Sequence, residues 1–153
     1  MKTVLITGSY RGLGYEVARQ LSHRGWQVIL TARKKNEGAA AAAELKNASF
    51  LELDVMDQSS IRRAAKNVGQ LDALINNAGI IADGDQDILT IEPELVASTI
   101  ATNALAALRV SQAFVPLLLK SPAGRIVNVS SGAGQLSDMG APGRQPTRHR
   151  KRP

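Results

Sequence analysis

Apolar runs and amphipathic stretches alternate along the chain from its second residue onward. The apolar runs lack a regular polar alternation, as expected of strands that are buried on both faces. They occupy residues 2–7, 26–32, 49–55, 71–76 and 124–131. The stretches between them have apolar residues at helical spacing, and they occupy residues 15–25, 37–45, 57–68 and 96–119. Five strands that alternate with four helices predict a parallel sheet with helices on both faces.

The order of these elements indicates a fold class. The first strand, the first helix and the second strand fit into about 30 residues, the length of a βαβ unit. The sequence therefore predicts an α/β protein with a Rossmann-type doubly wound parallel sheet, whose strand order runs 3-2-1-4-5-6. The alternation stops after Ser131, so we expect a truncated sheet of about five strands that lacks the C-terminal part of the domain.

Composition and charge narrow the function classes. The chain is 44% hydrophobic and has no cysteine, which excludes disulfides and thiolate metal sites. The apolar run at the N-terminus is too short for a signal peptide, and no run approaches the ~18 residues of a membrane-spanning helix. We therefore expect a cytoplasmic protein with no membrane partner. The net charge of +6 belongs mainly to the C-terminus, because residues 1–138 hold 14 Lys and Arg against all 13 Asp and Glu.

A glycine-rich loop joins the first predicted strand to the first helix. It reads TGSYRGLG from Thr7, and Gly8, Gly12 and Gly14 have G-x-x-x-G-x-G spacing. Glycine permits a tight turn and lets backbone N–H groups approach a phosphate at the positive end of the helix. An ordinary glycine-rich turn has the same composition, but the strand before the loop and the helix after it favour a dinucleotide-binding loop.

The end of the second strand indicates which dinucleotide is bound. Sheets of this type that bind NAD carry Asp or Glu there, about 20 residues beyond the glycine loop, to hold the ribose 2′-hydroxyl. Here the sequence is Thr31-Ala32-Arg33 followed by two lysines, and the nearest carboxylate belongs to Glu37. Arg33 is suited to a 2′-phosphate, and Arg11 in the glycine loop supplies a second cation. We expect NADP(H) rather than NAD(H); the alternative is a solvated basic turn.

These residues form part of a wider set of motifs. The set comprises TGSYRGLG at 7–14, LDV at 53–55, NNAG at 76–79, Asn103 in the long helix and GRIVNVSS at 124–131. Together the motifs resemble the short-chain dehydrogenases/reductases, and residues 28–45 are most similar to the NADPH-dependent carbonyl reductases of that family. The resemblance covers residues 2 to about 139 in unbroken order. It implies an oxidoreductase that reduces a carbonyl, or oxidises an alcohol, by hydride transfer.

The resemblance also implies roles in cofactor binding. Ser9, Arg11 and Leu13 would line the pyrophosphate and ribose beside the three glycines. Asp54 would accept a hydrogen bond from the adenine amino group, with Val55 beside the ring. The adenine-side ribose would run past Asn77, Ala78 and Gly79, which would also shape the cofactor cleft. The plainer interpretation of Asp54 is that it caps a helix.

The resemblance implies an incomplete catalytic set. Asn103 would distort its helix and hold a proton-relay water, and Ser131 would hydrogen-bond the substrate carbonyl, although Ser130 stays open as the catalytic serine. The family's proton donor is a Tyr, a dozen or so residues beyond the serine, with a Lys four residues later. A phenol with its ordinary pKa near 10 transfers protons poorly at neutral pH without such a cation. The chain has tyrosines only at Tyr10 and Tyr15, so the Tyr-x-x-x-Lys pair is absent.

Back-translation of residues 146–153 offers an explanation of the missing pair. With CGN arginine codons, a reading frame shifted by one base allows AYSASKTA, which contains Tyr-x-x-x-Lys at the family's distance from Ser131. We therefore expect an incomplete dinucleotide-binding Rossmann domain at 1–139 and a disordered, frameshift-derived basic tail at 140–153. The nucleotide sequence of the gene tests this, because the shifted frame must continue for a further hundred or so residues.

Two other functions stay open at this point. An NADP(H)-binding remnant without turnover fits the missing pair, and a nucleic-acid arm fits the five basic residues after position 143. The arm has no interleaved aromatic residues, so nucleic acid is not favoured as a partner. A sheet that stops at its fifth strand would expose residues 125–129 as an apolar edge, which invites pairing with another chain. Neither the substrate nor the oligomeric state is predicted.

No metal site is expected. Asp83, Asp85, Asp87 and Glu94 have the spacing of a calcium loop, but Ile88 stands where that loop needs glycine. The two histidines have no partners at ligand spacing: His23 and His149.

Overall fold

One parallel sheet organises the chain in the computed structural model, which describes residues 1–81 and 89–131. The strand order is β3-β2-β1-β4-β5, and each neighbouring pair is parallel. The predicted α/β class and the predicted order of the first five strands are confirmed. The strands are β1 (Thr3–Ile6), β2 (Gln27–Ala32), β3 (Ala48–Glu52), β4 (Ala73–Asn76) and β5 (Arg125–Asn128). The helices are α1 (Gly12–His23), α2 (Lys35–Ala43), α3 (Gln58–Lys66), α4 (Pro93–Ile100), the π-helical η1 (Ala101–Leu105) and α5 (Ala106–Leu118).

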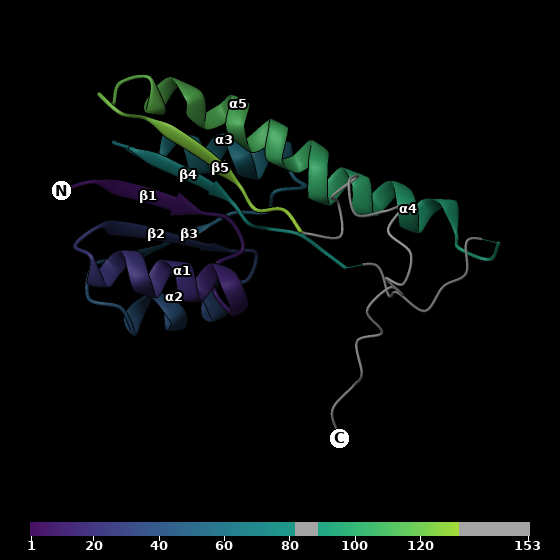
Figure 1. The fold of residues 1–153 in the computed structure, drawn as a ribbon, viewed down its shortest axis with the longest axis horizontal. Coiled ribbons are helices and arrows are strands. Elements are labelled where there is room, and N and C mark those ends of the chain that lie inside the picture. The colour runs from purple at the N-terminus through teal and green to yellow at the C-terminus, as the bar shows by residue number, and fades with distance from the viewer. Residues whose placement is uncertain (82–88, 132–153) are drawn as a thin grey trace, which may run out of the picture.

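Helices cover both faces of the sheet, as a parallel sheet requires. Figure 1 shows α1 and α2 on one face and α3 and α5 on the other. Each interface has its own apolar core. Leu5 and Leu74 of the sheet pack with Phe114 of α5, whereas Val28 packs with Ala18 of α1. The sheet thus separates two apolar cores. Polar side chains can reach solvent at the edges of the sheet.

β1 lies at the centre of the sheet and fixes the position of the glycine loop. Its residues Val4, Leu5 and Ile6 are fully buried. Successive side chains of a strand point to opposite faces, so Leu5 enters the core beneath α3 and α5, while its two neighbours enter the other core. The chain passes directly from Ile6 into Thr7 and Gly8, at the edge of the sheet where the carboxyl ends of its strands meet.

The long helix predicted at 96–119 consists of three successive segments, α4, η1 and α5. It begins earlier than predicted, at Pro93, because the fixed φ of proline and its missing N–H suit the first turn of a helix. The interruption at η1 was implied only by the resemblance, through the helix distortion expected at Asn103. α4 extends past the sheet in Figure 1, and none of its residues is buried.

Two smaller differences concern element ends. α1 begins at Gly12 and not near Tyr15. The first turn was missed because its glycines add nothing to the helical pattern of apolar residues. The cap of α3 is Asp57, whose Oδ1 accepts a hydrogen bond from the Ser59 N–H at 2.8 Å. Asp54 is therefore not the helix cap that its plainer interpretation suggested.

β5 differs from the other strands because all four of its residues are exposed. Within residues 1–81 and 89–131, β5 pairs only with β4. Its apolar residues Ile126 and Val127 are 41% and 48% exposed. The described part of the chain thus has the open apolar edge that the sequence predicts. The proposed tail at 140–153 lies outside the described residues, and the two-part division of the chain stays a prediction.

Candidate functional site

The loop between β1 and α1 has a backbone that requires glycine. Gly8 and Gly12 both have φ of +62°, a conformation that L side chains rarely adopt. A Cβ at Gly8 would lie 3.1 Å from the Cα of Ala78, and one at Gly14 would lie 2.9 Å from the carbonyl oxygen of Gly8. The loop therefore packs backbone against backbone, and its outer side stays open.

The N-terminus of α1 faces this open side, and its cap residue makes no side-chain hydrogen bond to it. The residue before the helix, Arg11, has extended backbone and makes no side-chain cap hydrogen bond, and the first turn has no acidic residue. The first N–H groups of a helix and its dipole favour an anion at this place. The loop can therefore hold a phosphate without displacing a carboxylate.

Buried hydroxyl groups hold the loop to its neighbouring strands. The Ser9 hydroxyl donates to the Ile6 carbonyl at 2.8 Å and accepts from the Thr31 N–H at 3.0 Å. Ser9 is fully buried, and its own N–H donates to the Thr31 carbonyl. Ser9 therefore supports the loop from within and is not among the residues that line the cavity described below.

A second set of hydrogen bonds connects the loop to the chain after β4. The Thr7 hydroxyl oxygen accepts from the N–H groups of Asn77 and Ala78, both at 2.9 Å. The Asn77 side chain donates in return to the carbonyls of Thr7 and Gly8, at 3.0 and 3.2 Å. The NNAG motif is thereby fixed against the glycine loop, although the two are about 70 residues apart in the chain.

These segments enclose a cavity of about 440 Å³ at the carboxyl edge of the sheet. Most of the predicted cofactor residues line it: Gly8, Arg11, Gly12, Arg33, Asp54, Val55, Asn77, Ala78 and Gly79. Three do not: Ser9, Leu13 and Gly14. Gly14 is buried beneath the loop, and the Leu13 side chain is 60% exposed. Six further lining residues were not among the predicted cofactor residues: Tyr10, Ala32, Leu53, Met56, Ile80 and Thr102.

Asp54 is held in place at one end of this cavity. Its Oδ1 accepts from the Met56 N–H at 2.9 Å, and its own N–H donates to the Ser60 hydroxyl at 3.0 Å. The Met56 sulfur in turn lies 3.4 Å from the Thr102 hydroxyl oxygen, whose proton is shared with the Ser98 carbonyl at 2.9 Å. The turn after β3 is therefore tied both to α3 and to the long helix, and it keeps a carboxylate on the cavity wall.

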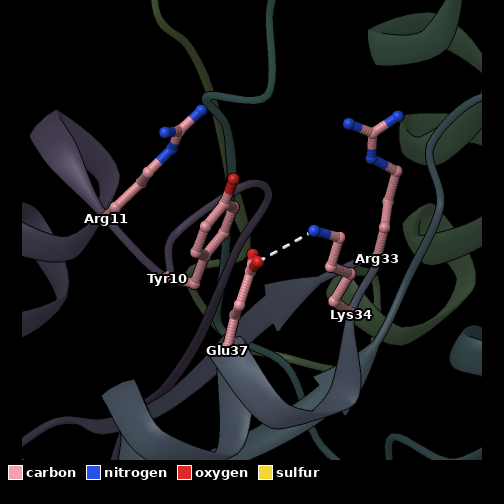
Figure 2. Close-up of a pocket in the computed structure, with 5 residues that line it drawn as sticks. All are labelled: Tyr10, Arg11, Arg33, Lys34 and Glu37. Atoms are coloured by element: carbon pink, nitrogen blue, oxygen red, sulfur yellow. Dashed lines mark hydrogen bonds and ion pairs between the residues drawn. The ribbon is translucent and has the colours of Figure 1, made fainter.

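A basic pocket of about 590 Å³ adjoins the cavity and shares Tyr10, Arg11 and Arg33 with it. Figure 2 shows the guanidinium groups of Arg11 and Arg33 on either side of the Tyr10 ring. Arg11 lies 5.2 Å from the centroid of that ring, and Lys34 forms an ion pair with Glu37 at 3.1 Å. The only carboxylate in the lining thus already has a cation, and two arginines remain to meet an anion.

Asn103 lies in the middle of η1. Its Oδ1 accepts from the Ile80 N–H and its Nδ2 donates to the Ile80 carbonyl, both at 2.8 Å. A side-chain amide thus pairs with a backbone as a neighbouring strand would, and the helix widens to a π turn there. The helix distortion implied at Asn103 is present; a bound proton-relay water stays a prediction.

A hollow of about 420 Å³ contains Asn103 together with Ser111, Asn128 and Ser130. Behind it the Asn76 side chain donates to the Ser111 hydroxyl at 3.0 Å and to the Asn128 side-chain oxygen at 2.8 Å. Ser130 lines this hollow, whereas Ser131 is not among its lining residues. The structure thus brings one of the two candidate serines together with Asn103, and the choice between them stays open.

The described segments contain no group of three His, Cys, Asp or Glu side chains that could hold a metal ion. Most of the calcium-like spacing, including Asp83, Asp85 and Asp87, lies outside the described residues, as does His149. No helix in the described segments is long and apolar enough to cross a membrane.

The family model for short chain dehydrogenases matches residues 2–143. The chain belongs to this family. Its members are oxidoreductases that bind NAD(P)(H), and both the glycine loop and the cavity lie within the matched residues. The motif-based resemblance is confirmed at the level of the family.

Two curated relatives show how much of a short-chain dehydrogenase is present. The chain is 38% identical to (+)-neomenthol dehydrogenase of Arabidopsis thaliana over 88% of its length, which corresponds to 55% of that protein. It is 37% identical to a 3-oxoacyl-acyl-carrier-protein reductase of Vibrio harveyi over 91% of its length, or 58% of that protein. The chain therefore spans little more than half the length of these relatives.

Solved structures agree with the fold. A short chain dehydrogenase from Escherichia coli CFT073 superposes with a TM-score of 0.81 at 28% identity, covering 87% of this chain and 63% of the other. An actinorhodin polyketide ketoreductase variant with NADPH superposes with a TM-score of 0.78 at 29% identity, covering 85% and 53%. The described sheet and helices are thus those of the family's N-terminal portion.

Proposed function

We propose that this chain binds NADP(H), in preference to NAD(H), as the dinucleotide-binding part of a carbonyl reductase or alcohol dehydrogenase. The observation that supports the preference is the basic pocket at the end of the cavity. Arg33 occupies the position after β2, and Arg11 faces the same pocket from the glycine loop. Arginine matches a phosphate group with several donors at once, whereas an NAD-specific site would present a carboxylate.

The residues present fit such a ligand along the whole cavity. The positive end of α1 would hold the pyrophosphate, and the two arginines would hold the 2′-phosphate. Asp54 and Val55 would border the adenine, and the segment from Asn77 to Gly79 would run past the adenine-side ribose. When bound, NADP(H) supplies or accepts the hydride.

Carbonyl reduction also requires a proton donor, and the described residues offer no suitable one. Asn103 and either Ser130 or Ser131 would orient a small carbonyl or alcohol substrate. Tyr10 lies in the basic pocket, and Tyr15 donates a hydrogen bond to Glu44, which raises the pKa of its phenol. Neither tyrosine lines the hollow that contains Asn103.

A second candidate function follows from this absence. The given chain would bind NADP(H) and turn over slowly or not at all, because no residue of the described segments replaces the missing Tyr-x-x-x-Lys pair. An NADPH oxidation assay against a panel of aldehydes and ketones separates the two functions. Turnover clearly above the protein-free background favours the reductase, and a flat trace with intact NADPH binding favours the remnant. A cytoplasmic location stays a prediction.

Arg33 gives the test of the cofactor preference. Arg33→Ala should weaken NADPH binding about 10- to 100-fold, the value of one charge-assisted contact, and leave NADH binding almost unchanged. Arg33→Asp should shift the preference toward NADH, because the carboxylate can accept from a free 2′-hydroxyl. Titration calorimetry, or the fluorescence of the reduced nicotinamide, measures both.

The control is Arg62→Ala, which removes an exposed arginine from α3, outside the cavities described. It should leave both affinities unchanged. Equal binding of NADPH by the Arg33→Ala variant and the parent chain would overturn the proposed preference. Trp26 is a poor reporter for this titration, because it precedes β2 at the amino edge of the sheet, beside Lys2.

A further inference from the structure

Tyr10 lies where the cavity of about 440 Å³ and the basic pocket meet, because its side chain lines both. It is the one aromatic residue of the glycine loop TGSYRGLG, and it directly precedes Arg11, the cap of α1. Glycine in such a loop lets the backbone approach a phosphate closely. The position of the one bulky ring in the loop therefore bears on what the pocket can bind.

Two contacts hold the Tyr10 ring in place. The ring is half-buried and packs against the apolar core on the α1 and α2 face of the sheet. The Arg11 guanidinium lies 5.2 Å from the ring centroid, a distance at which a cation and an aromatic face attract each other. Both contacts use the ring alone, so neither requires the phenol hydroxyl.

The hydroxyl group of Tyr10 is directed into the basic pocket. Figure 2 shows it at the end of the ring that lies between the guanidinium groups of Arg11 and Arg33. No hydrogen bond joins it to the other four residues of the pocket lining. A phenol hydroxyl can donate a hydrogen bond, as the guanidinium groups can. An anion between the two arginines would therefore meet a third donor.

The charges of the pocket match a phosphate monoester. Lys34 and Glu37 neutralise each other in an ion pair, which leaves the two positive charges of Arg11 and Arg33. A phosphate monoester carries a charge of about −1.5 to −2 at neutral pH and has three acceptor oxygens. A third donor leaves this balance unchanged if it is neutral, as the Tyr10 hydroxyl is.

We propose that Tyr10 is a specificity-determining residue, whose hydroxyl donates a hydrogen bond to the 2′-phosphate of NADP(H) between the two arginines. This role rests on the proposed binding of NADP(H). NAD(H) has no phosphate at this position, so the hydroxyl raises the affinity for NADP(H) alone. If Tyr10 served only as a support for Arg11, a phenylalanine would do equally well.

Tyr10→Phe separates these two roles, because it keeps the ring and removes only the hydroxyl. In titrations of the full chain, the variant should bind NADPH about ten-fold more weakly than the parent chain does, with NADH binding unchanged. Its thermal unfolding midpoint should stay close to that of the parent chain, because the ring still packs. Tyr15→Phe is the matched control: it removes a hydroxyl that donates to Glu44 outside the pocket, and it should leave both affinities unchanged.

A second measurement leaves Tyr10 itself intact. The chain has two tyrosines, so labelling their Cζ atoms with ¹³C gives two resonances, and the Tyr15→Phe variant assigns them. The probes are adenosine 2′,5′-bisphosphate and 5′-AMP, which differ only in the 2′-phosphate. The bisphosphate should shift the Tyr10 resonance clearly more than 5′-AMP does. The Tyr15 resonance should move with neither nucleotide.

The outcomes separate this role from the proposed function. Equal binding of NADPH and NADH by the parent chain would overturn both the cofactor preference and the role of Tyr10. A parent preference for NADPH that Tyr10→Phe retains in full would overturn the role of Tyr10 alone. The same conclusion would follow if the variant lost affinity for both cofactors equally, or if the two adenosine nucleotides shifted the Tyr10 resonance by the same amount.

Discussion

β1 and β5 are both four-residue apolar strands of one parallel sheet, yet their surroundings are opposite. Residues Val4 to Ile6 of β1 are completely buried, whereas every residue of β5 is exposed. The difference comes from position in the strand order, since β1 has neighbours on both sides and β5 has one among the described residues. An apolar strand therefore stabilises this sheet only as far as neighbouring strands and helices cover it.

Alanine substitutions at two directly paired positions of β4 and β5 should show the difference between a covered and an uncovered strand most clearly. Leu74 of β4 is fully buried, and its partner Ile126 in β5 is 41% exposed. We expect Leu74→Ala to lower the free energy of unfolding by about 2–5 kcal/mol, because it leaves a cavity between the sheet and α5. Ile126→Ala should cost less than about 1 kcal/mol. Urea unfolding followed by circular dichroism measures both, and equal losses would contradict the assignment of β5 as an uncovered edge.

Substitutions of Thr7 test whether its buried hydroxyl holds the chain after β4 in the shape that the dinucleotide site needs. Thr7→Val keeps the shape of the side chain but leaves the N–H groups of Asn77 and Ala78 without their acceptor. We expect a loss of about 1–3 kcal/mol in unfolding free energy, with weaker NADPH binding. Thr7→Ser restores the acceptor and should recover most of both quantities. If Thr7→Val binds NADPH as the parent chain does, the hydroxyl has no part in shaping the site.

Asp72 hydrogen-bonds both Thr3 of β1 and Ser121, which precedes β5. Among the three substitutions, its replacement should change the free energy of unfolding least. Its carboxylate accepts from the Ser121 hydroxyl at 2.6 Å and from the Thr3 N–H at 2.7 Å, and these contacts lower its pKa. Because the pKa is lower in the folded chain, the stabilisation is complete above the unfolded value near 3.9 and is lost as pH falls through the folded value.

The variant Asp72→Asn should remove this pH dependence. At neutral pH it should lower the free energy of unfolding by about 1 kcal/mol, and the difference from the parent chain should shrink as the pH falls below 4. Urea midpoints between pH 7 and pH 2.5 give the comparison. A constant difference across that range would show that the carboxylate charge does not contribute.

The sequence predicted the sheet well because burial on both faces leaves a strong pattern. The runs around Leu5, Leu30 and Leu74 are apolar without alternation, and all three became central strands. The strand predicted through Val55 ends earlier, at Glu52, because Asp54 and Met56 form a turn that depends on contacts with α3 and the long helix. Such a turn has no signature in local periodicity.

The candidate site was predictable where the backbone demands a residue type. The left-handed conformation of Gly8 and Gly12 can be inferred from the loop motif. The interest of Arg33 can be inferred because no Asp or Glu stands at the end of the second strand. The buried hydroxyl of Ser9 and the Thr102 contact with Met56 depend on segments that meet only in the folded chain. The family resemblance implied that Ser9 lines the pyrophosphate and ribose, and the sequence alone does not show that Thr31 hydrogen-bonds its hydroxyl.

The double hydrogen bond between Asn103 and Ile80 has a consequence for how this fold can vary. It joins two positions 23 residues apart. The two ends of the intervening segment are therefore held together by these hydrogen bonds, whatever the sequence between them. Lengthening a closed loop costs little free energy, since the cost rises only with the logarithm of its length. Insertions between the two residues should therefore be tolerated without moving the cavity wall, which makes this connection a natural place for the family to add or remove residues.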